Sequence, residues 1–236
     1  MNFKLIVFLL FFGCIPTQAQ NVDTYFTAAD TFFKTYVDNG KVDYKAIQEN
    51  PSRLNALVNM AKEIRVSTAV PNIYKSFWIN TYNILVIKGI IEHYPLKSPL
   101  DVDGFFDKTK YTAGGELSTL NEIENRLLRA KFPNEPRFHF VLVCAGMGCP
   151  PIINEAYVPN NLENQLQRQT EKALNDPKFI RKEENGVKVS QIFEWYKSDF
   201  ENAGGILPFI NTYRKTRLPV TIKIDYYPYD WTLNSK

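Results

Sequence analysis

The spacing of apolar residues predicts three helices in the first hundred residues. Two of them, over 23–38 and 52–64, carry apolar side chains on one face at intervals of three and four residues. The third, over 73–94, is apolar around nearly its whole circumference, as expected of a helix in the middle of a core. Asn80 and Asn83 lie on one face of that helix, where buried amides need hydrogen-bond partners.

The middle of the chain mixes short strands with helices. Residues 110–117 read as a hairpin, and Thr119 with Glu122 forms a capping box for a helix that ends near Ala130. Residues 137–143 end in an apolar run, which is typical of a central strand. A helix over 159–174 follows.

The last sixty residues continue this mixture. Asn185-Gly186 indicates a hairpin over 179–190, and residues 190–200 read as a helix with apolar side chains facing inward. A glycine pair ends it, a short helix reaches about Lys215, and residues 221–226 read as a closing strand.

Helices followed by mixed strands and helices, without regular βαβ alternation, favour an α+β fold. We expect N-terminal helices and a buried central helix packed on a small mixed or antiparallel sheet. The length after residue 19 favours a single domain over 20–236.

Residues 1–19 have the pattern of a secretory signal peptide. Lys4 precedes an apolar run too short to span a bilayer, and Thr17-Gln-Ala19 offers a small-x-small cleavage site. We therefore expect cleavage after Ala19 and a secreted or periplasmic mature protein. Cys14 offers a competing lipoprotein site, but the residues before it are a poor match.

The charge balance excludes some classes of partner. The chain has 28 basic and 25 acidic residues, and loss of Lys4 with the leader would leave a net charge of +2. Without a basic run, neither nucleic acid nor a membrane surface is an expected partner. No segment after the leader approaches the ~20 apolar residues of a transmembrane helix. The expected partner is a small-molecule or peptide ligand.

The two cysteines outside the predicted leader, Cys144 and Cys149, mark the candidate site. An apolar run leads to Cys144, small residues follow, and two prolines come after Cys149. A cysteine at a strand end is a good nucleophile if its pKa is lowered, and the backbone amides of 145–148 could stabilise an oxyanion. The alternative is a disulfide or an inert pair, because lone cysteines commonly pair in an oxidising compartment.

A thiol nucleophile needs a proton acceptor, and the sequence has only two histidines. His139 precedes Cys144 by five residues, so in an unbroken strand the two side chains would point to opposite faces. A bulge or an early strand end would be needed to bring them together. His93 lies at the end of the central helix, and either histidine is more often structural than catalytic.

Other chemistry is weakly represented. Asp199 and Asp230, each beside aromatic residues, could orient a base or could cap locally. A metal site on His139, Cys144 and Cys149 is disfavoured because their spacing differs from that of structural zinc sites. Phosphate loops, nucleophile elbows and zinc-helix motifs are absent from the sequence, so no cofactor is expected.

Five segments combine polar residues with apolar surroundings: 77–83, 119–124, 139–151, 193–200 and 229–234. Together and in this order they resemble the domain-of-unknown-function 547 family, over most of residues 40–234. The resemblance implies a site and no particular reaction. The residues that it implicates are Asn80, Tyr82, Asn83, His139, Cys144, Cys149 and Asp230. The family includes members expected inside cells, where disulfides do not persist, which strengthens the thiol interpretation of Cys144.

The chain departs from the family pattern at two positions. Asn125 stands where a histidine is common after Ile-Glu, and Val143 stands where an asparagine is common before the cysteine. If that histidine is the family's base, Asn125 cannot replace it, because an amide accepts no proton at neutral pH.

Two hypotheses follow from these residues. In the first, the protein is a thiol hydrolase or acyltransferase acting on amide-like bonds. Cys144 would be its nucleophile, His139 or His93 its base, and Asn80 or Asp230 the orienting group. In the second, it is a non-catalytic binding or structural module in which Cys144 and Cys149 form a disulfide or an inert pair.

Overall fold

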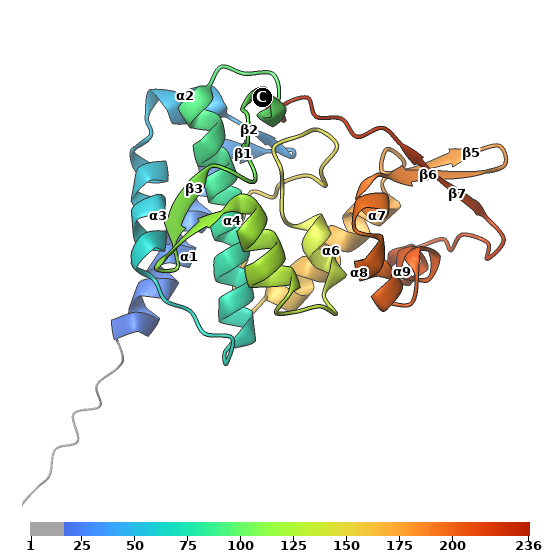
Figure 1. Ribbon diagram of the computed structural model, residues 1–236, viewed down its shortest axis with the longest axis horizontal. Helices are drawn as coiled ribbons and strands as arrows, with labels where there is room; N and C mark the ends of the chain where they lie inside the picture. The colour runs from blue at the N-terminus through green and yellow to red at the C-terminus, as the bar shows by residue number, and fades with distance from the viewer. Residues whose placement is uncertain (1–16) are drawn as a thin grey trace, which may run out of the picture.

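Helices form the N-terminal half of the chain (Figure 1). The computed structural model describes residues 17–236, so most of the predicted leader lies outside it. Four helices pack together: α1 (Thr17–Tyr36), α2 (Tyr44–Glu49), α3 (Ser52–Glu63) and α4 (Pro71–His93). A two-residue hairpin of β1 (Val37–Asp38) and β2 (Lys41–Val42) turns at Asn39-Gly40, where both φ angles are positive.

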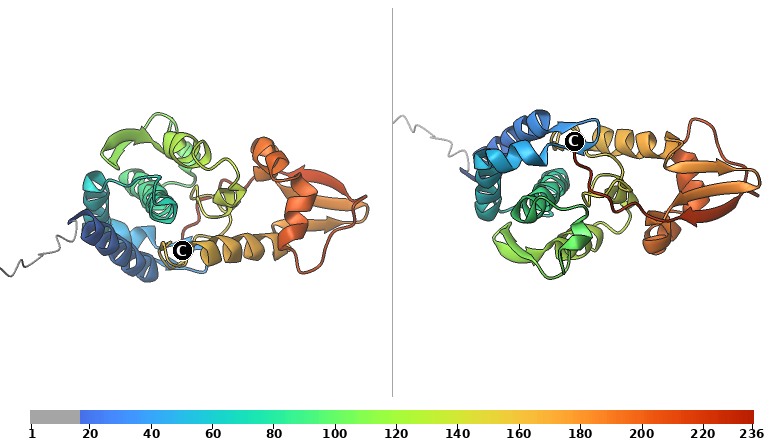
Figure 2. Two further views of the ribbon diagram at one scale, coloured as in Figure 1. Left: turned by 90° about the horizontal axis from the view of Figure 1, so that it is seen from below. Right: turned by 90° about the horizontal axis from the view of Figure 1, so that it is seen from above.

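The central helix α4 is buried as its sequence predicts. Its side chains are buried on every face from Ser76 to Ile87. Pro71 stands in its first turn, where the missing N–H costs nothing. The helices α1, α2 and α3 pack against it (Figure 2), and Tyr25 of α1 hydrogen-bonds Thr81 across 2.9 Å.

The capping box begins the next helical segment, as predicted. After η1 (Pro99–Asp101), the hairpin of β3 (Lys110–Ala113) and β4 (Glu116–Thr119) leads into α5 (Leu120–Glu122). Thr119 and Glu122 bond each other's backbone N–H groups. The helix then widens into a π-helix, η2 (Ile123–Arg129), whose residues help to form the candidate site.

The strand predicted over residues 137–143 is wrong. A short 3-10 helix, η3 (Pro136–Phe140), takes its place, and the N–H groups of Val141 and Leu142 donate to the Phe138 carbonyl. The misleading signal was a run of consecutive buried residues, which suits a central strand and a buried turn equally well. Pro136 at the first helical position supplies the preset φ that favours the helical turn.

The second half of the chain contains the largest sheet. Helix α6 (Leu162–Asn175) leads to β5 (Ile180–Glu183), which pairs antiparallel with β6 (Gly186–Ser190), and β7 (Lys223–Tyr227) pairs parallel with β6. Three helices lie between β6 and β7 in the sequence: α7 (Ile192–Trp195), α8 (Lys197–Asn202) and α9 (Ile206–Tyr213). The helix predicted over 190–200 is thus two helices, with a break at Tyr196. The predicted α+β class is confirmed.

Two apolar clusters form the core, one among α1–α4 and the other between the three-stranded sheet and α7–α9. Helix α6 joins them, because Leu162 and Leu166 lie in the first cluster and Ala173 and Leu174 in the second. Figure 2 shows the sheet at the opposite end of the molecule from α1. Over residues 17–236, no helix has the length and apolar character that crossing a membrane requires.

Candidate functional site

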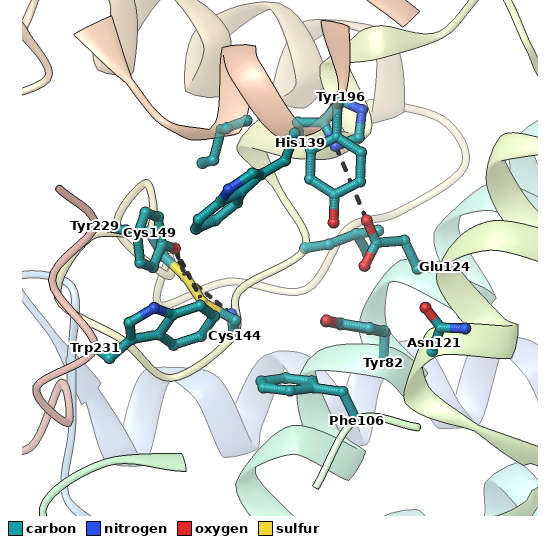
Figure 3. Close-up of a pocket in the computed structure, with 13 residues that line it drawn as sticks. Tyr82, Phe106, Asn121, Glu124, His139, Cys144, Cys149, Tyr196, Tyr229 and Trp231 are labelled. Carbon is teal, nitrogen blue, oxygen red and sulfur yellow. Dashed lines mark hydrogen bonds and ion pairs between the residues drawn. A yellow bond between two sulfur atoms is a disulfide. The ribbon is translucent and has the colours of Figure 1, made fainter. Parts of the chain in front are cut away.

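A cavity of about 280 Å³ lies between the two clusters (Figure 3). Tyr82 and Leu142 come to it from the first cluster, and Ile192 comes from the second. Six aromatic side chains form much of its wall: Tyr82, Phe106, Trp195, Tyr196, Tyr229 and Trp231. Its other polar lining residues are Asn121, Glu124, His139, Cys144 and Cys149.

The two sulfur atoms of the cavity lie at disulfide distance from each other. The Cα atoms of Cys144 and Cys149 are 6.5 Å apart, a separation that a disulfide can span. The Tyr229 hydroxyl donates to Cys149 Sγ at 2.8 Å and lies 3.0 Å from Cys144 Sγ. The Cys144 N–H also points at Cys149 Sγ, 3.0 Å away. Two hydrogen-bond donors therefore converge on the Cys149 sulfur.

Asn83 holds the backbone that leads to Cys144. Its side-chain amide donates to the Val141 carbonyl at 3.0 Å, and its oxygen accepts from the Val143 N–H at 2.9 Å. In a sheet, a neighbouring strand would bind these backbone N–H and carbonyl groups. Here one buried side chain of α4 makes both hydrogen bonds. Asn80, one turn earlier on α4, binds the N–H and carbonyl of Tyr157 in the same way.

The turn after Cys144 is strained and tightly packed. Ala145 has a φ of 64°, a left-handed conformation that costs a residue other than glycine about 1–3 kcal/mol. A Cβ on Gly148 would lie 2.9 Å from the backbone nitrogen of Asp230, so only glycine allows this approach. Such strain is found at functional sites more often than elsewhere.

Two of the backbone amides that were expected to stabilise an oxyanion, those of Met147 and Gly148, are hydrogen-bonded to the C-terminal segment. The Met147 N–H donates to the Thr232 carbonyl at 2.8 Å, and the Gly148 N–H donates to the Asp230 carbonyl at 2.7 Å. These two amides hold the turn against residues 230–232. They are not free to bind a ligand oxygen.

His139 faces the same cavity as Cys144. The strand-parity objection does not apply, because the residues between them form a 3-10 helix and a turn. His139 Nε2 lies 2.8 Å from Asp199 Oδ2, and its ring stacks on Tyr196 with the centroids 3.9 Å apart. Its Nδ1 lies 4.0 Å from Glu124 Oε1. The His139 imidazole and the Cys144 sulfur thus line one cavity. The imidazole hydrogen-bonds Asp199, and the sulfur lies 3.0 Å from the Tyr229 hydroxyl.

Asp199 is anchored on its other side by Arg129. The guanidinium makes two hydrogen bonds to the carboxylate, at 2.7 and 2.8 Å. Burial acts to raise the pKa of Asp199, but the hydrogen bonds from His139 and Arg129 outweigh it and hold that pKa well below its usual value. Asp199 therefore stays ionised and orients the imidazole.

Glu124 is the carboxylate that points into the cavity (Figure 3). Tyr82 and Tyr196 line the cavity beside it (Figure 3). Burial and the Glu124 charge raise the pKa of both phenols well above their usual value, so both remain protonated donors.

The remaining predicted residues lie outside the cavity wall. His93 is exposed at the end of α4. Asp230 accepts from the Thr232 N–H and stabilises a turn of the C-terminal segment. Asn125 accepts a hydrogen bond from Arg129. Asn125 is thus not part of the cavity wall, whereas His139 is.

Sequence reasoning missed several residues of the cavity. The cavity residues Glu124, Trp195, Tyr196, Tyr229 and Trp231 appeared only within the family-like segments, and none was named as a candidate. Their common signal is a polar or aromatic residue at an element boundary, such as the helix break at Tyr196. Among residues 17–236, no group of three or more His, Cys, Asp or Glu side chains could hold a metal ion.

The comparisons with known proteins identify a family without a known reaction. Neither curated proteins nor solved structures include a match to this chain. Residues 67–173 match the model of the family described as protein of unknown function, DUF547. This segment contains Asn80, Asn83, His139, Cys144 and Cys149, and it confirms the family predicted from the sequence. The family model thus assigns the segment of residues 67–173 to DUF547.

Proposed function

We propose that the protein is a thiol hydrolase or acyltransferase that acts on amide-like bonds. The observation that carries the proposal is the meeting of Cys144 and an Asp199-oriented His139 in one cavity. A nucleophile, a base and a group that orients the base are the parts that acyl transfer through a cysteine requires.

Cys144 must first be released from Cys149. A dithiol reductant would supply two electrons and two protons to the sulfur pair and leave as its own disulfide. The Cys144 sulfur then attacks the carbonyl carbon of the substrate, and a carbon–sulfur bond forms. The carbon–nitrogen bond breaks as the amine leaves, and water or an acceptor amine later breaks the thioester.

His139 moves the protons in this scheme. When its Nε2–H donates to Asp199, the lone pair of Nδ1 is left on the side of Glu124 and the cavity. Nδ1 takes the thiol proton and returns it to the leaving amine, as a general base and then a general acid. Asp199 stabilises the imidazolium formed in between, as the buried carboxylate of a catalytic triad does.

The two donors at Cys149 Sγ complete the site. The Cys144 N–H and the Tyr229 hydroxyl converge on this sulfur at 3.0 and 2.8 Å. In the proposed reaction, Cys149 moves aside after reduction, and the oxyanion of the tetrahedral intermediate takes its place. Such donors stabilise charge that develops in the transition state.

Hydrolysis of an activated aryl ester and an aryl amide tests the proposal. We expect release of the aryl group by the dithiol-reduced protein and little release by the unreduced protein. Cys144→Ala should abolish it, whereas Cys149→Ala should remove the need for reduction. Full activity of Cys144→Ala would overturn the proposal.

The competing function is a binding or structural module with an oxidised sulfur pair. The disulfide distance between Cys144 and Cys149 favours it, as would export into an oxidising compartment. Titration of free thiols in the native protein separates the two. If neither cysteine reacts even after treatment with a dithiol, the module is favoured. Two thiols that appear on reduction and restore activity favour the enzyme.

A further inference from the structure

The charge of the cavity is unbalanced. Glu124 is the one carboxylate among its lining residues within 17–236, and neither lysine nor arginine lines it. Other half-buried carboxylates have arginine partners, since Asp199 pairs with Arg129 and Glu135 with Arg137. The side chain of Glu124 is only 12% exposed, and the one basic nitrogen within 4.0 Å of it in this part of the chain is His139 Nδ1. The Arg129 guanidinium interacts with the Glu124 charge, but its direct hydrogen bonds to a carboxylate go to Asp199.

A buried carboxylate without a cation in direct contact is costly. The carboxylate oxygens of Glu124 have lone pairs that can accept from a further donor in the cavity. A positively charged group in the cavity would complete its coordination.

Aromatic rings form the opposite wall of the cavity. Trp195 and Trp231 stack with their centroids 6.0 Å apart, and Tyr229 lies 5.0 and 4.8 Å from them. Phe106 extends this surface on the other side of Trp231, at 6.2 Å. Trp195 is 47% exposed, which is unusual for a large ring and opens the wall to a ligand. The faces of such rings attract cations and also contact aliphatic chains.

We propose that the cavity binds ligands that carry a protonated primary amine on a short aliphatic chain. The ammonium group binds Glu124, and the chain lies along Trp195, Trp231 and Tyr229. This inference rests on the proposed function and names its substrate class: amides or esters whose acyl part ends in an amine. The arrangement rejects carboxylate-bearing analogues, because Glu124 repels them.

Binding to the unreduced protein tests the inference apart from catalysis. The probe is n-butylammonium, with n-butanol as the neutral analogue and butyrate as the anion, and tryptophan fluorescence is the signal. We expect n-butylammonium to bind at least about tenfold more tightly than n-butanol, with no binding of butyrate. Equal affinity for n-butylammonium and n-butanol would overturn the inference, and this comparison needs no variant.

Two variants locate the ammonium group. Glu124→Gln should remove the preference for n-butylammonium, whereas Glu49→Gln, at an exposed carboxylate of α2, should keep it. Trp231→Leu should weaken binding while leaving the charge preference in place. A full preference in folded Glu124→Gln would contradict the inference.

The substrate test distinguishes the two proposals. The reduced protein is given the p-nitrophenyl esters of aminohexanoate and hexanoate. If the protein binds n-butylammonium but cleaves neither ester, the proposed function fails and the inference stands. If it cleaves both esters equally, the inference fails and the proposed function stands. A kcat/KM at least about tenfold higher for aminohexanoate supports both.

Discussion

At the scale of single residues, the Tyr229 hydroxyl connects the two sulfurs. It donates to Cys149 Sγ and lies 3.0 Å from Cys144 Sγ. Burial is the main cause that raises the pKa of Tyr229 well above its usual value, so the phenol stays protonated and can donate. This is the property that an oxyanion donor needs.

Tyr229→Phe removes this hydroxyl and keeps the ring beside Trp231. We expect ester cleavage by the reduced protein to fall by about a hundredfold, as when other oxyanion donors are removed. Steady-state kinetics measures the loss. Tyr226→Phe, on β7 and outside the cavity wall, is the control and should leave the rate unchanged. An unaltered rate in Tyr229→Phe would remove the hydroxyl from the mechanism.

Asp199→Asn tests the pair that orients His139. The substitution leaves Arg129 half-buried without its carboxylate partner, which should cost about 1–3 kcal/mol of unfolding free energy at neutral pH. The pKa of Asp199 is lowered by folding, so its stabilising effect is present above the usual aspartate pKa and is lost as the pH falls.

Urea unfolding at several pH values checks this expectation. The difference between the unsubstituted protein and Asp199→Asn should be full above about pH 5 and should shrink below about pH 4. Asp103→Asn, which removes an exposed ion pair with Lys108, should change stability by no more than about 0.5 kcal/mol. A difference between the protein and Asp199→Asn that stays constant from pH 7 to pH 3 would contradict the assignment.

At the scale of elements, α4 supports two loops through two asparagines. Asn83 binds Val141 and Val143 next to Cys144, and Asn80 binds Tyr157 in the same geometry. Either change to alanine leaves a buried N–H and a buried carbonyl without a partner. Each should therefore cost about 2–4 kcal/mol.

The two variants should differ in their effect on the site. Asn83→Ala should change the rate at which reduced Cys144 reacts with iodoacetamide, because the backbone before Cys144 loses its support. Asn80→Ala, with a similar loss of stability, should leave that rate unchanged. Peptide mass spectrometry measures the labelling, and equal effects of the two variants would show that Asn83 has no special link to Cys144.

Elements with a strong local signal could be predicted from the sequence. The all-round apolar pattern located α4, the capping box located the start of α5, and Asn185-Gly186 located the β5–β6 hairpin. The segment 137–143 was misjudged because a run of buried residues carries no period that separates a strand from a buried turn. Its conformation depends on Asn83, a tertiary contact that local patterns do not reveal.

The candidate site was also predictable only in part, because tertiary contacts bring some of its residues together. Cys144, Cys149, His139 and Tyr82 were found and do line the cavity. Glu124 and Tyr229 were missed, because their roles arise from contacts of the η2 helix with His139 and of the C-terminal segment with Cys149. Side chains brought together from distant elements leave no spacing in the sequence.

At the scale of the whole molecule, the cavity lies where two apolar clusters meet, and α6 joins the clusters. Leu166 belongs to the first cluster and Leu174, two turns later, to the second. If residues 20–236 form a single domain, as the sequence predicts, the two clusters should unfold together.

Unfolding followed by tryptophan fluorescence tests this cooperativity. Trp78 reports the first cluster, and Trp195 and Trp231 report the cavity. The double variant Trp195→Phe, Trp231→Phe isolates Trp78, and Trp78→Phe isolates the cavity pair. Within each variant, the fluorescence midpoint in urea should coincide with the midpoint from far-UV circular dichroism. Two separated transitions within one variant would contradict a single cooperative unit.

The measurement that tests the central claim most directly is the capture of an acyl group on Cys144. The dithiol-reduced protein is mixed with p-nitrophenyl acetate, quenched in acid and digested, and the acetylated peptide is identified by mass spectrometry. The account predicts a thioester on Cys144 that hydroxylamine removes, and much slower acetylation of Cys144 in His139→Asn. Acetylation of Cys149 at the same rate as Cys144, or unchanged acetylation of Cys144 in His139→Asn, would contradict it.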